Sequence, residues 1–448
     1  MTRINQPPDL LRLAKKLVAF GRRSGADEVE VTIVDGREFS VDVRLGKIEN
    51  LIEAGTRHLS VRVIKDQKTA YASSSDLSAE ILKRLIRNAV ERAVLASHDQ
   101  CAGLPVLPSA RIDAASLKIF DPQIQKLEPA RKIELALETE RIALEDKRIT
   151  NSHGASFTTD EMTTILANSH GLLGSYDQTF CSLSVGLQAG GTDDRVEDYW
   201  SSAQRFYQDL ETPESVARRA VERTVRQLKP RKISTRTVPV IFEPLMTEWL
   251  LGFLFACVSG VAVYHKSTFL ADRLGEKIGR DLISIIDDGL MPGKLGSRPF
   301  DTEGVPCGKT TVLEKGVLRH FICNTYAGRK LNLETTGNAD GTGVGPNNFY
   351  LVPGTISPQE VLAATRQGLF LTRTIGHGLN PVTGDISRGA FGLWVEGGEV
   401  AYPVSEITIS GNLKEILNQV DMVGNDLEFR SSVCGPTIRV AEMTVAGE

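Results

Sequence analysis

The first quarter of the chain combines helical and strand periodicities. Apolar residues at helical spacing predict a first helix over Pro8–Arg23, which ends at Gly25, and a second amphipathic helix over Ser78–Ser97. Between them apolar and polar residues alternate, with short turns expected at Asp35-Gly36 and Gly46, as is typical of antiparallel strands with one wet face. The predicted strands are Glu28–Val34, Glu38–Arg44, Ile48–Ala54 and His58–Ile64.

The middle of the chain begins and ends with non-periodic segments. Gly103–Gln125 is richer in Pro and Ser and is interpreted as a connection. A helix is expected over Glu128–Glu145, and short strands with turn residues between them over Ile149–Arg205. A helix over Pro213–Leu228 closes this part, and the basic run Lys229–Thr237 marks the main boundary.

From Val238 onward the pattern is mostly that of short strands. One substantial apolar helix is expected over Pro244–Ser259, with shorter helices near Ser357–Thr365 and Asn412–Val420. Two strand-like runs around a Gly-Gly turn predict a β-hairpin over Ala390–Ile409. A closed or barrel-like sheet is the natural way to bury so many short strands without open edges.

The predicted fold class is therefore α+β: an N-terminal antiparallel sheet with two helices, a middle α/β segment, and a β-rich barrel-like C-terminal domain. The chain has 448 residues, whereas single cores stop growing near ~250–300 residues, so several domains are expected. The predicted boundaries are 1–102, 103–232 and 233–448.

Composition excludes some classes of function. The formal net charge of −4 disfavours a sequence-independent DNA binder, which needs surplus Lys and Arg, so nucleic acid is not an expected partner. The six cysteines form no C-x-x-C pair and suit free thiols in a reducing compartment. No signal-peptide pattern and no run near the ~20 apolar residues of a membrane span occur. We therefore expect a cytoplasmic protein without membrane contact.

No local catalytic signature stands out. The glycines of Gly304–Thr310 are one residue too close for a phosphate-binding P-loop, and Pro306 removes a needed N–H group. The seven histidines are dispersed, and none is followed by Glu. His320 and Cys323 lie three apart in a predicted strand and so point to opposite faces. The residues themselves therefore predict no metal site.

Several long stretches resemble the TldD/PmbA family, and specifically its PmbA (TldE) branch. The resemblance covers essentially the whole chain and is strongest from about Gly296. It implies the family's layout, with a β-rich C-terminal domain that in the TldD branch carries a zinc peptidase site. The stretches that carry it are Tyr264–Ile278, Gly296–Leu318, Thr325–Ala339, Thr383–Leu413 and Val423–Gly447.

The TldD branch has a His-Glu-x-x-x-His helix motif, in which the histidines bind zinc and the Glu serves as base. Placed on this chain without gaps, with His265-Lys266 as anchor, the motif falls on Gly252, Phe253 and Cys257. Both imidazoles and the carboxylate are absent there. The resemblance therefore implies no catalytic residue and no metal ligand in this chain, and a zinc ion in a partner subunit instead. Cys434 is not assigned a ligand role.

The resemblance implies a function as the metal-free subunit of a heterodimeric zinc metallopeptidase. Its partner would be a TldD-like subunit with His-Glu-x-x-x-His, and the pair would trim unfolded or extended peptides, including peptide precursors during maturation. An extended peptide can add a strand to a sheet edge, which makes the loop Gly376–Arg388 and the following hairpin candidates for a substrate channel. The candidate channel residues are Asp385, Ser387, Arg388, Trp394 and Tyr402.

Other interpretations stay open at this point. For Asp385, Ser387 and Arg388, turn chemistry at a hairpin is an equally good explanation. The chain could be a stand-alone regulatory or binding protein of the gyrase-modulator type, which its acidic balance does not directly support. It could also be a metallopeptidase with a non-standard ligand set, such as Cys257, His265 and Cys434.

Overall fold

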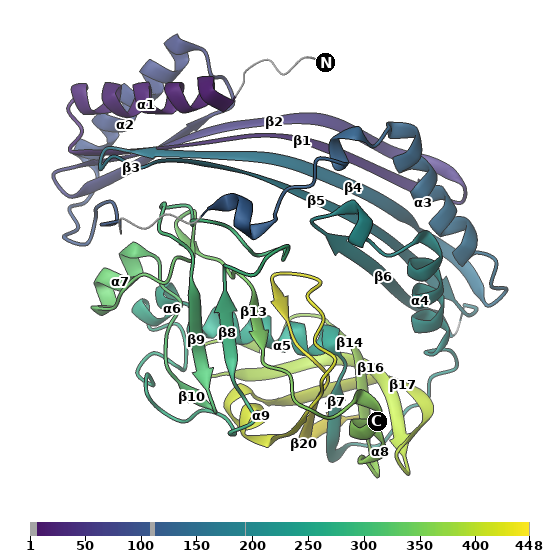
Figure 1. Ribbon diagram of the computed structural model, residues 1–448. Coiled ribbons are helices and arrows are strands. Elements are labelled where there is room, and N and C mark those ends of the chain that lie inside the picture. The colour runs from purple at the N-terminus through teal and green to yellow at the C-terminus, as the bar shows by residue number, and fades with distance from the viewer. Residues whose placement is uncertain (1–6, 108–112, 193, 448) are drawn as a thin grey trace.

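The computed structural model describes residues 7–107, 113–192 and 194–447, so part of the predicted connection Gly103–Gln125 lies outside the described residues. The chain is a mixed α+β protein, as predicted, and its first half forms a long sheet that arches over the C-terminal half (Figure 1). The first elements are α1 (Pro7–Arg23), β1 (Glu28–Arg44), β2 (Lys47–Lys65), β3 (Lys68–Ser74) and α2 (Ala79–Leu95).

The four short strands predicted near the N-terminus are in fact two long ones, β1 and β2. The predicted turn at Asp35-Gly36 is wrong, because β1 continues through it, with Gly36 opposite Thr56 of β2 and Met162 on the other side. A Cβ atom on Gly36 would lie 2.8 Å from the carbonyl oxygen of Glu161. The glycine thus permits a close approach of two strands, whereas Gly46 does lie at the turn between β1 and β2.

The sheet continues into the middle of the chain. Its six strands follow the order β3-β2-β1-β4-β5-β6, and β1 pairs with β4 from Glu30–Asn168 to Val43–Ala155. One sheet therefore spans the predicted boundary at residue 102, and the division into domains there stays a prediction. The middle elements are η1 (Ala114–Leu117), η2 (Ile124–Lys126), α3 (Pro129–Ala143), β4 (Ile149–Asn168), β5 (Leu173–Ala189), β6 (Val196–Gln204), η3 (Tyr207–Asp209) and α4 (Pro213–Val225).

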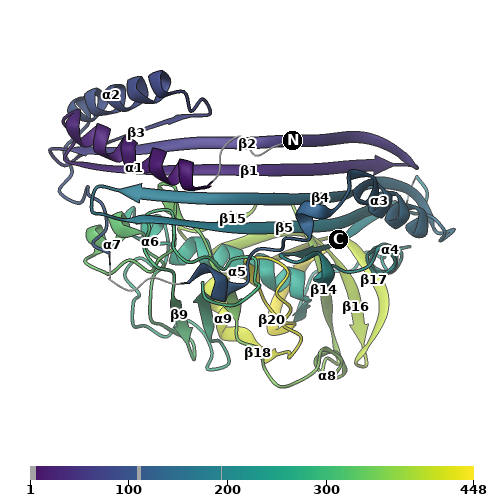
Figure 2. The same cartoon turned by 45° about the horizontal axis from the view of Figure 1, so that its top comes forward.

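The helices of the first half cover the outer face of this sheet. Val29, Val31 and Ile33 of β1 pack with α1 and α2, while Val41 and Val43 of the same strand pack with α3 and α4. These positions are all odd-numbered and therefore share one face of the strand. The other face is turned toward the C-terminal half, as the rotated view shows (Figure 2).

The C-terminal half contains the predicted barrel. Strands β14, β7, β20, β17 and β16 pair in that order, and β14 also pairs with β16, which closes a five-strand barrel. A second, five-stranded sheet has the order β10-β9-β8-β13-β19. The barrel and its extensions are β7 (Arg236–Phe242), β14 (Gln367–Ile375), β15 (Leu379–Asn380), β16 (Asp385–Glu396), β17 (Glu399–Asn412), β18 (Val420–Val423) and β20 (Ile438–Ala446). The second sheet and a small hairpin comprise β8 (Ile285–Asp288), β9 (Lys309–Glu314), β10 (Val317–Leu318), β11 (Ala339–Asp340), β12 (Gly343–Val344), β13 (Phe349–Leu351) and β19 (Val433–Cys434).

One apolar helix lies between the barrel and the second sheet and joins both to one core. The predicted helix over Pro244–Ser259 is confirmed as α5 (Pro244–Val258), and Leu250, Leu254 and Val258 on it are almost fully buried. Pro244 suits the first turn of a helix, where its missing N–H is not needed. The remaining helices are α6 (Gly260–Tyr264), α7 (Thr325–Leu331), α8 (Pro358–Ala363) and α9 (Leu413–Gln419). None of the described helices is long and apolar enough to cross a membrane.

Buried charges connect the sheet to the C-terminal half. Arg62 and Glu30 lie side by side on neighbouring strands, and the Arg62 guanidinium donates to the Glu303 carboxylate at 3.0 Å. The side chains of Arg62 and Glu303 are only 9% and 5% exposed. Burial raises the pKa of Glu30 to about 8, although Arg62 opposes the rise. Glu30 is therefore held largely as the neutral acid near pH 7.

We expect the variant Glu30→Gln to be more stable than the wild type at pH 8, by at least about 1 kcal/mol, and equally stable at pH 4.5. The folded pKa of about 8 lies above the usual 4.5, so between these values the folded protein holds a proton that the unfolded chain releases. The contribution of Glu30 to the stability of the wild type therefore falls as the pH rises from 4.5 to about 8. Urea unfolding at pH 4.5 and pH 8 measures the free energy of unfolding of both proteins. Glu49→Gln, at an exposed position, is the control. A gain in stability that is the same at both pH values would contradict the raised pKa of Glu30.

Candidate cavity over helix α5

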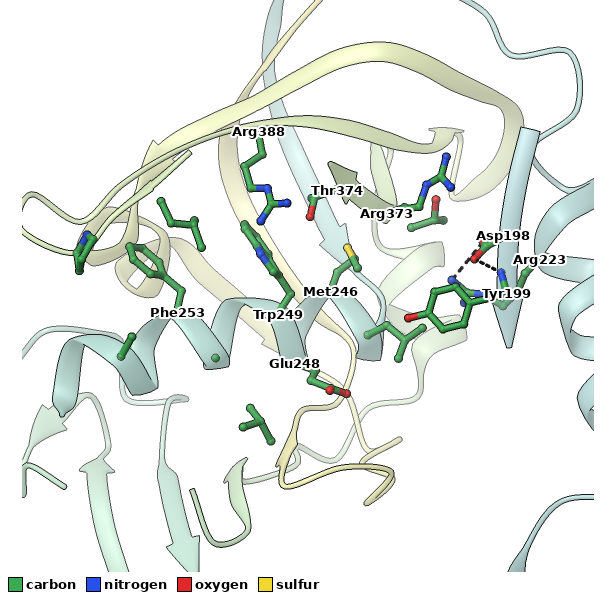
Figure 3. A pocket seen from close by; sticks show the side chains of 17 residues that line it. Asp198, Tyr199, Arg223, Met246, Glu248, Trp249, Phe253, Arg373, Thr374 and Arg388 are labelled. Carbon is green, nitrogen blue, oxygen red and sulfur yellow. Dashed lines mark hydrogen bonds and ion pairs between the residues drawn. The ribbon is translucent and has the colours of Figure 1, made fainter. Parts of the chain in front are cut away.

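A cavity of about 890 Å³ opens between the edge strand β6 and the barrel, above helix α5 (Figure 3). This volume is in the range of sites that take small ligands or parts of peptides. The residues that line it come from seven separate parts of the chain. They are Asp198, Tyr199, Arg223, Leu245, Met246, Glu248, Trp249, Gly252, Phe253, Ala256, Thr372, Arg373, Thr374, Leu379, Pro381, Arg388 and Val433.

Helix α5 provides the floor of the cavity. Its lining residues recur three or four positions apart, so they lie on one side of the helix, and Met246, Trp249 and Phe253 make this side largely apolar. A Cβ atom on Gly252 would meet no atom within 4 Å. The glycine thus leaves the middle of the floor open.

Two arginines from neighbouring barrel strands form the opposite wall. The Arg388 guanidinium lies over the Trp249 ring at 5.3 Å from its centroid, and Thr374 lies beside it (Figure 3). Arg373 stacks on Phe391 at 4.2 Å and donates to the Glu197 carbonyl at 2.7 Å. Among the described residues, neither arginine forms an ion pair with a carboxylate. This wall of the cavity therefore carries positive charge without a counter-ion among the residues that the structure describes.

The other charged groups of the lining form hydrogen bonds or ion pairs within the chain. Arg223 donates to Glu243 at 2.7 Å and lies 3.4 Å from Asp198. Glu248 accepts a hydrogen bond from the Ser431 hydroxyl at 2.9 Å, and burial raises the pKa of its carboxyl group. The positive charge of the lining that lacks a carboxylate partner among the described residues is thus that of the two barrel arginines.

The three positions on which the family resemblance places the zinc motif do not fit a zinc ion. Gly252 and Phe253 line the cavity but offer no ligand atom. Cys257 is fully buried and lies outside the lining, and burial raises the pKa of its thiol to about 12. Cys257 therefore presents no ligand atom to the cavity.

The alternative ligand set of Cys257, His265 and Cys434 does not come together in space. No group of three His, Cys, Asp or Glu residues in the described part of the chain could hold a metal ion. The Cys434 thiol donates to the Ser431 carbonyl at 3.2 Å, and burial raises its pKa as well. The geometry thus counts against this ligand set, while the zinc content of the protein stays a prediction.

Of the five predicted channel residues, Arg388 alone belongs to the cavity lining. Asp385 and Ser387 are exposed on the same strand. Asp385 accepts hydrogen bonds from Thr383 and Asn412, as expected if its role is to stabilise the turn. Trp394 is fully buried inside the barrel core and does not line the cavity. Tyr402 is half-buried away from it, under Arg231. Contact of these four residues with a peptide stays a prediction.

The sequence analysis did not identify Trp249, Met246 and Arg373, which also line the cavity. A signal was present on the helix, because Glu248-Trp249 interrupts an otherwise apolar run and thereby marks a partly open side. No signal distinguished Arg373, whose place follows from the pairing of β14 with β16.

Models of a known family match nearly the whole chain. They are described as domain 1, the central domain and the C-terminal domain of PmbA/TldA metallopeptidases, and they match residues 29–93, 122–228 and 235–447. The metalloprotease PmbA of Escherichia coli O157:H7 is 38% identical over 432 residues, which cover 96% of this chain and 94% of that protein. A PmbA homologue of Haemophilus influenzae is 36% identical over 446 residues, which cover 99% and 97%.

Solved structures have the same fold. A Thermotoga maritima protein described in relation to DNA gyrase modulation aligns with a TM-score of 0.89 and 27% identity, covering 98% of this chain and 100% of that one. TldE from Thermococcus kodakarensis aligns with a TM-score of 0.88 and 23% identity, covering 97% and 100%. The family models and the relatives together show that this chain belongs to the PmbA/TldD family of metallopeptidases.

Proposed function

We propose that this chain is the metal-free subunit of a heterodimeric zinc metallopeptidase that acts on unfolded or extended peptides. The observation that carries the proposal is the chemistry of the cavity over α5. Where a zinc peptidase of this family would present two imidazoles and a carboxylate, the cavity presents Gly252, Phe253 and two uncompensated arginines. Such a surface can bind an apolar and anionic part of a peptide, but it cannot activate water through a metal.

The zinc would then come from a second chain with the His-Glu-x-x-x-His motif. The long hairpin of β1 and β2 supports pairing with such a chain. Residues 47–56 of β2 are all exposed, and β3 pairs with β2 only from Leu59 to Lys65, so residues 47–58 have no outer neighbour among the described strands. Open strand edges of this kind pair readily with another chain. Leu45, Ile48 and Leu51 add apolar side chains that are 58%, 48% and 45% exposed.

We expect the double variant Ile48→Asp/Leu51→Asp to weaken the pairing with the His-Glu-x-x-x-His chain by about tenfold or more, because two charges would enter an apolar contact. The variant should fold normally, since both side chains are exposed. Surface plasmon resonance with the purified partner measures the affinity. Val94→Asp on α2, which is also 48% exposed, is the matched control and should pair normally. Unchanged affinity of the double variant would show that this surface does not take part in pairing with the partner chain.

A further inference from the structure

We propose that the cavity over α5 binds the C-terminal residue of a peptide, with its carboxylate at Arg388 and its apolar side chain on the floor beside Trp249. The inference rests on the proposed function, since it names the part of the peptide that this subunit holds. It follows from three properties of the cavity: an open apolar floor, an unpaired cationic wall directly above it, and the short distance between them.

The floor accepts an apolar side chain. Met246, Trp249 and Phe253 form one apolar side of α5, and nothing fills the space above Gly252. Burial of an apolar side chain there would release water from both surfaces, which is favourable by about 25 cal/mol per Å² of buried area. The floor does not, by itself, distinguish the end of a peptide from its middle.

The cationic wall distinguishes the end of a peptide from its middle. Arg388 has no carboxylate partner among the described residues, and within them it donates one long hydrogen bond, of 3.4 Å, to the Ile375 carbonyl. A guanidinium binds a carboxylate through two parallel hydrogen bonds, which are stronger than bonds between neutral groups. Thr374 lies beside it with a hydroxyl group that can donate a further bond (Figure 3). Arg373 adds a second positive charge to the same wall.

The arrangement fits a C-terminal residue better than an internal acidic one. Because Arg388 lies over the Trp249 ring at 5.3 Å, the anion and the apolar group of the ligand must be close neighbours. A C-terminal Leu or Phe carries both on one Cα atom. An internal Asp or Glu carries the carboxylate at the end of its side chain and has no second, apolar side chain on the same Cα.

Calorimetry on the isolated full-length chain tests the inference with three ligands. They are an unstructured peptide that ends in Phe with a free carboxylate, the same peptide with an amidated C-terminus, and free phenylpropionic acid. The free-carboxylate peptide is expected to bind about tenfold more tightly than the amidated one, the loss expected for a charge-assisted hydrogen bond. Phenylpropionic acid should bind more weakly than the peptide, because it lacks the preceding residues.

Variants at two positions separate the wall from the floor. Arg388→Gln should bind both peptides equally weakly, whereas Arg388→Lys should keep part of the preference for the free carboxylate. Gly252→Leu should block both peptides without loss of folding, since its side chain enters open space and glycine is unfavourable inside a helix. Arg218→Gln on the exposed side of α4, where Arg218 pairs with Glu214, is the matched control and should bind as the wild type does.

Equal binding of the free and amidated peptides, or an unchanged preference in Arg388→Gln, would overturn the inference. Binding of phenylpropionic acid as tight as that of the peptide would also overturn it, in favour of a small carboxylic acid as the ligand. These outcomes differ from a failure of the proposed function, because they involve no partner and no proteolysis. If the chain prefers peptides with a free C-terminus but forms no active pair with the partner, the inference stands and the proposed subunit role is wrong.

Discussion

Co-expression of this chain with a paralogue that carries His-Glu-x-x-x-His is expected to produce a peptidase that neither chain provides alone. Under the proposed function, the cavity of this chain would bind peptide without a metal-activated nucleophile, and the partner would supply that nucleophile. Cleavage of an unstructured fluorogenic peptide measures the activity, which a chelator should abolish. Replacement of the Glu in the partner's motif should reduce turnover by several orders of magnitude, while Cys434→Ala in this chain should leave it nearly unchanged.

The matched control for this experiment is the same pair with a folded protein as substrate, which should be cleaved slowly because only extended chains reach the site. Peptidase activity of this chain alone, at a comparable rate and in the presence of a chelator, would contradict the subunit assignment. A failure of the two chains to associate at micromolar concentration would contradict it as well.

Replacement of Arg62 by Met is expected to destabilise the protein by about 3–5 kcal/mol, the second large effect. The change leaves the Glu303 carboxylate buried without its cation at the junction between the sheet and the C-terminal half. Glu303→Gln alone should cost less, because an amide oxygen can still accept the hydrogen bond from the Thr325 N–H. Urea unfolding of the purified variants measures the free energies.

The double variant Arg62→Met/Glu303→Gln decides whether the buried pair acts as a unit. It should be more stable than Arg62→Met, since the uncompensated charge is then removed as well. Additive costs of the two changes would mean that the residues act independently. Arg141→Gln on the surface of α3, where Arg141 is 64% exposed in its pair with Glu145, should change stability by no more than about 1 kcal/mol.

The local periodicity of the sequence predicted the types of most elements but not the lengths of the strands. Alternation around Gly36 is continuous, yet a glycine after an aspartate has the chemistry of a turn, and the strand on its other side lies more than a hundred residues further along the chain. Only the pairing of β1 with β4 shows why glycine is needed there. For the same reason, one sheet across residue 102 could not be deduced from local patterns. The barrel could be predicted, because many short strands need a closed sheet.

The site was predictable where one segment determined it and hidden where several segments meet. The apolar helix α5 was predicted from the sequence alone. The placement of the zinc motif on Gly252, Phe253 and Cys257 rests on the family resemblance and stays a prediction. Arg388 of β16 is one of the predicted channel residues and lines the cavity. Trp394 of the same strand was also predicted but is buried in the barrel core. Arg373 reaches the cavity through the register between β14 and β16, which no local pattern encodes.

Zinc analysis of the purified pair tests the central claim most directly, namely that this chain contributes binding without metal chemistry. We predict about one zinc per pair of chains and substoichiometric zinc in this chain alone. Zinc should remain when Cys257 and Cys434 of this chain are both replaced by Ala, and should disappear when a histidine of the partner's motif is replaced. About two zinc ions per pair, or loss of zinc on replacing those cysteines, would contradict the account.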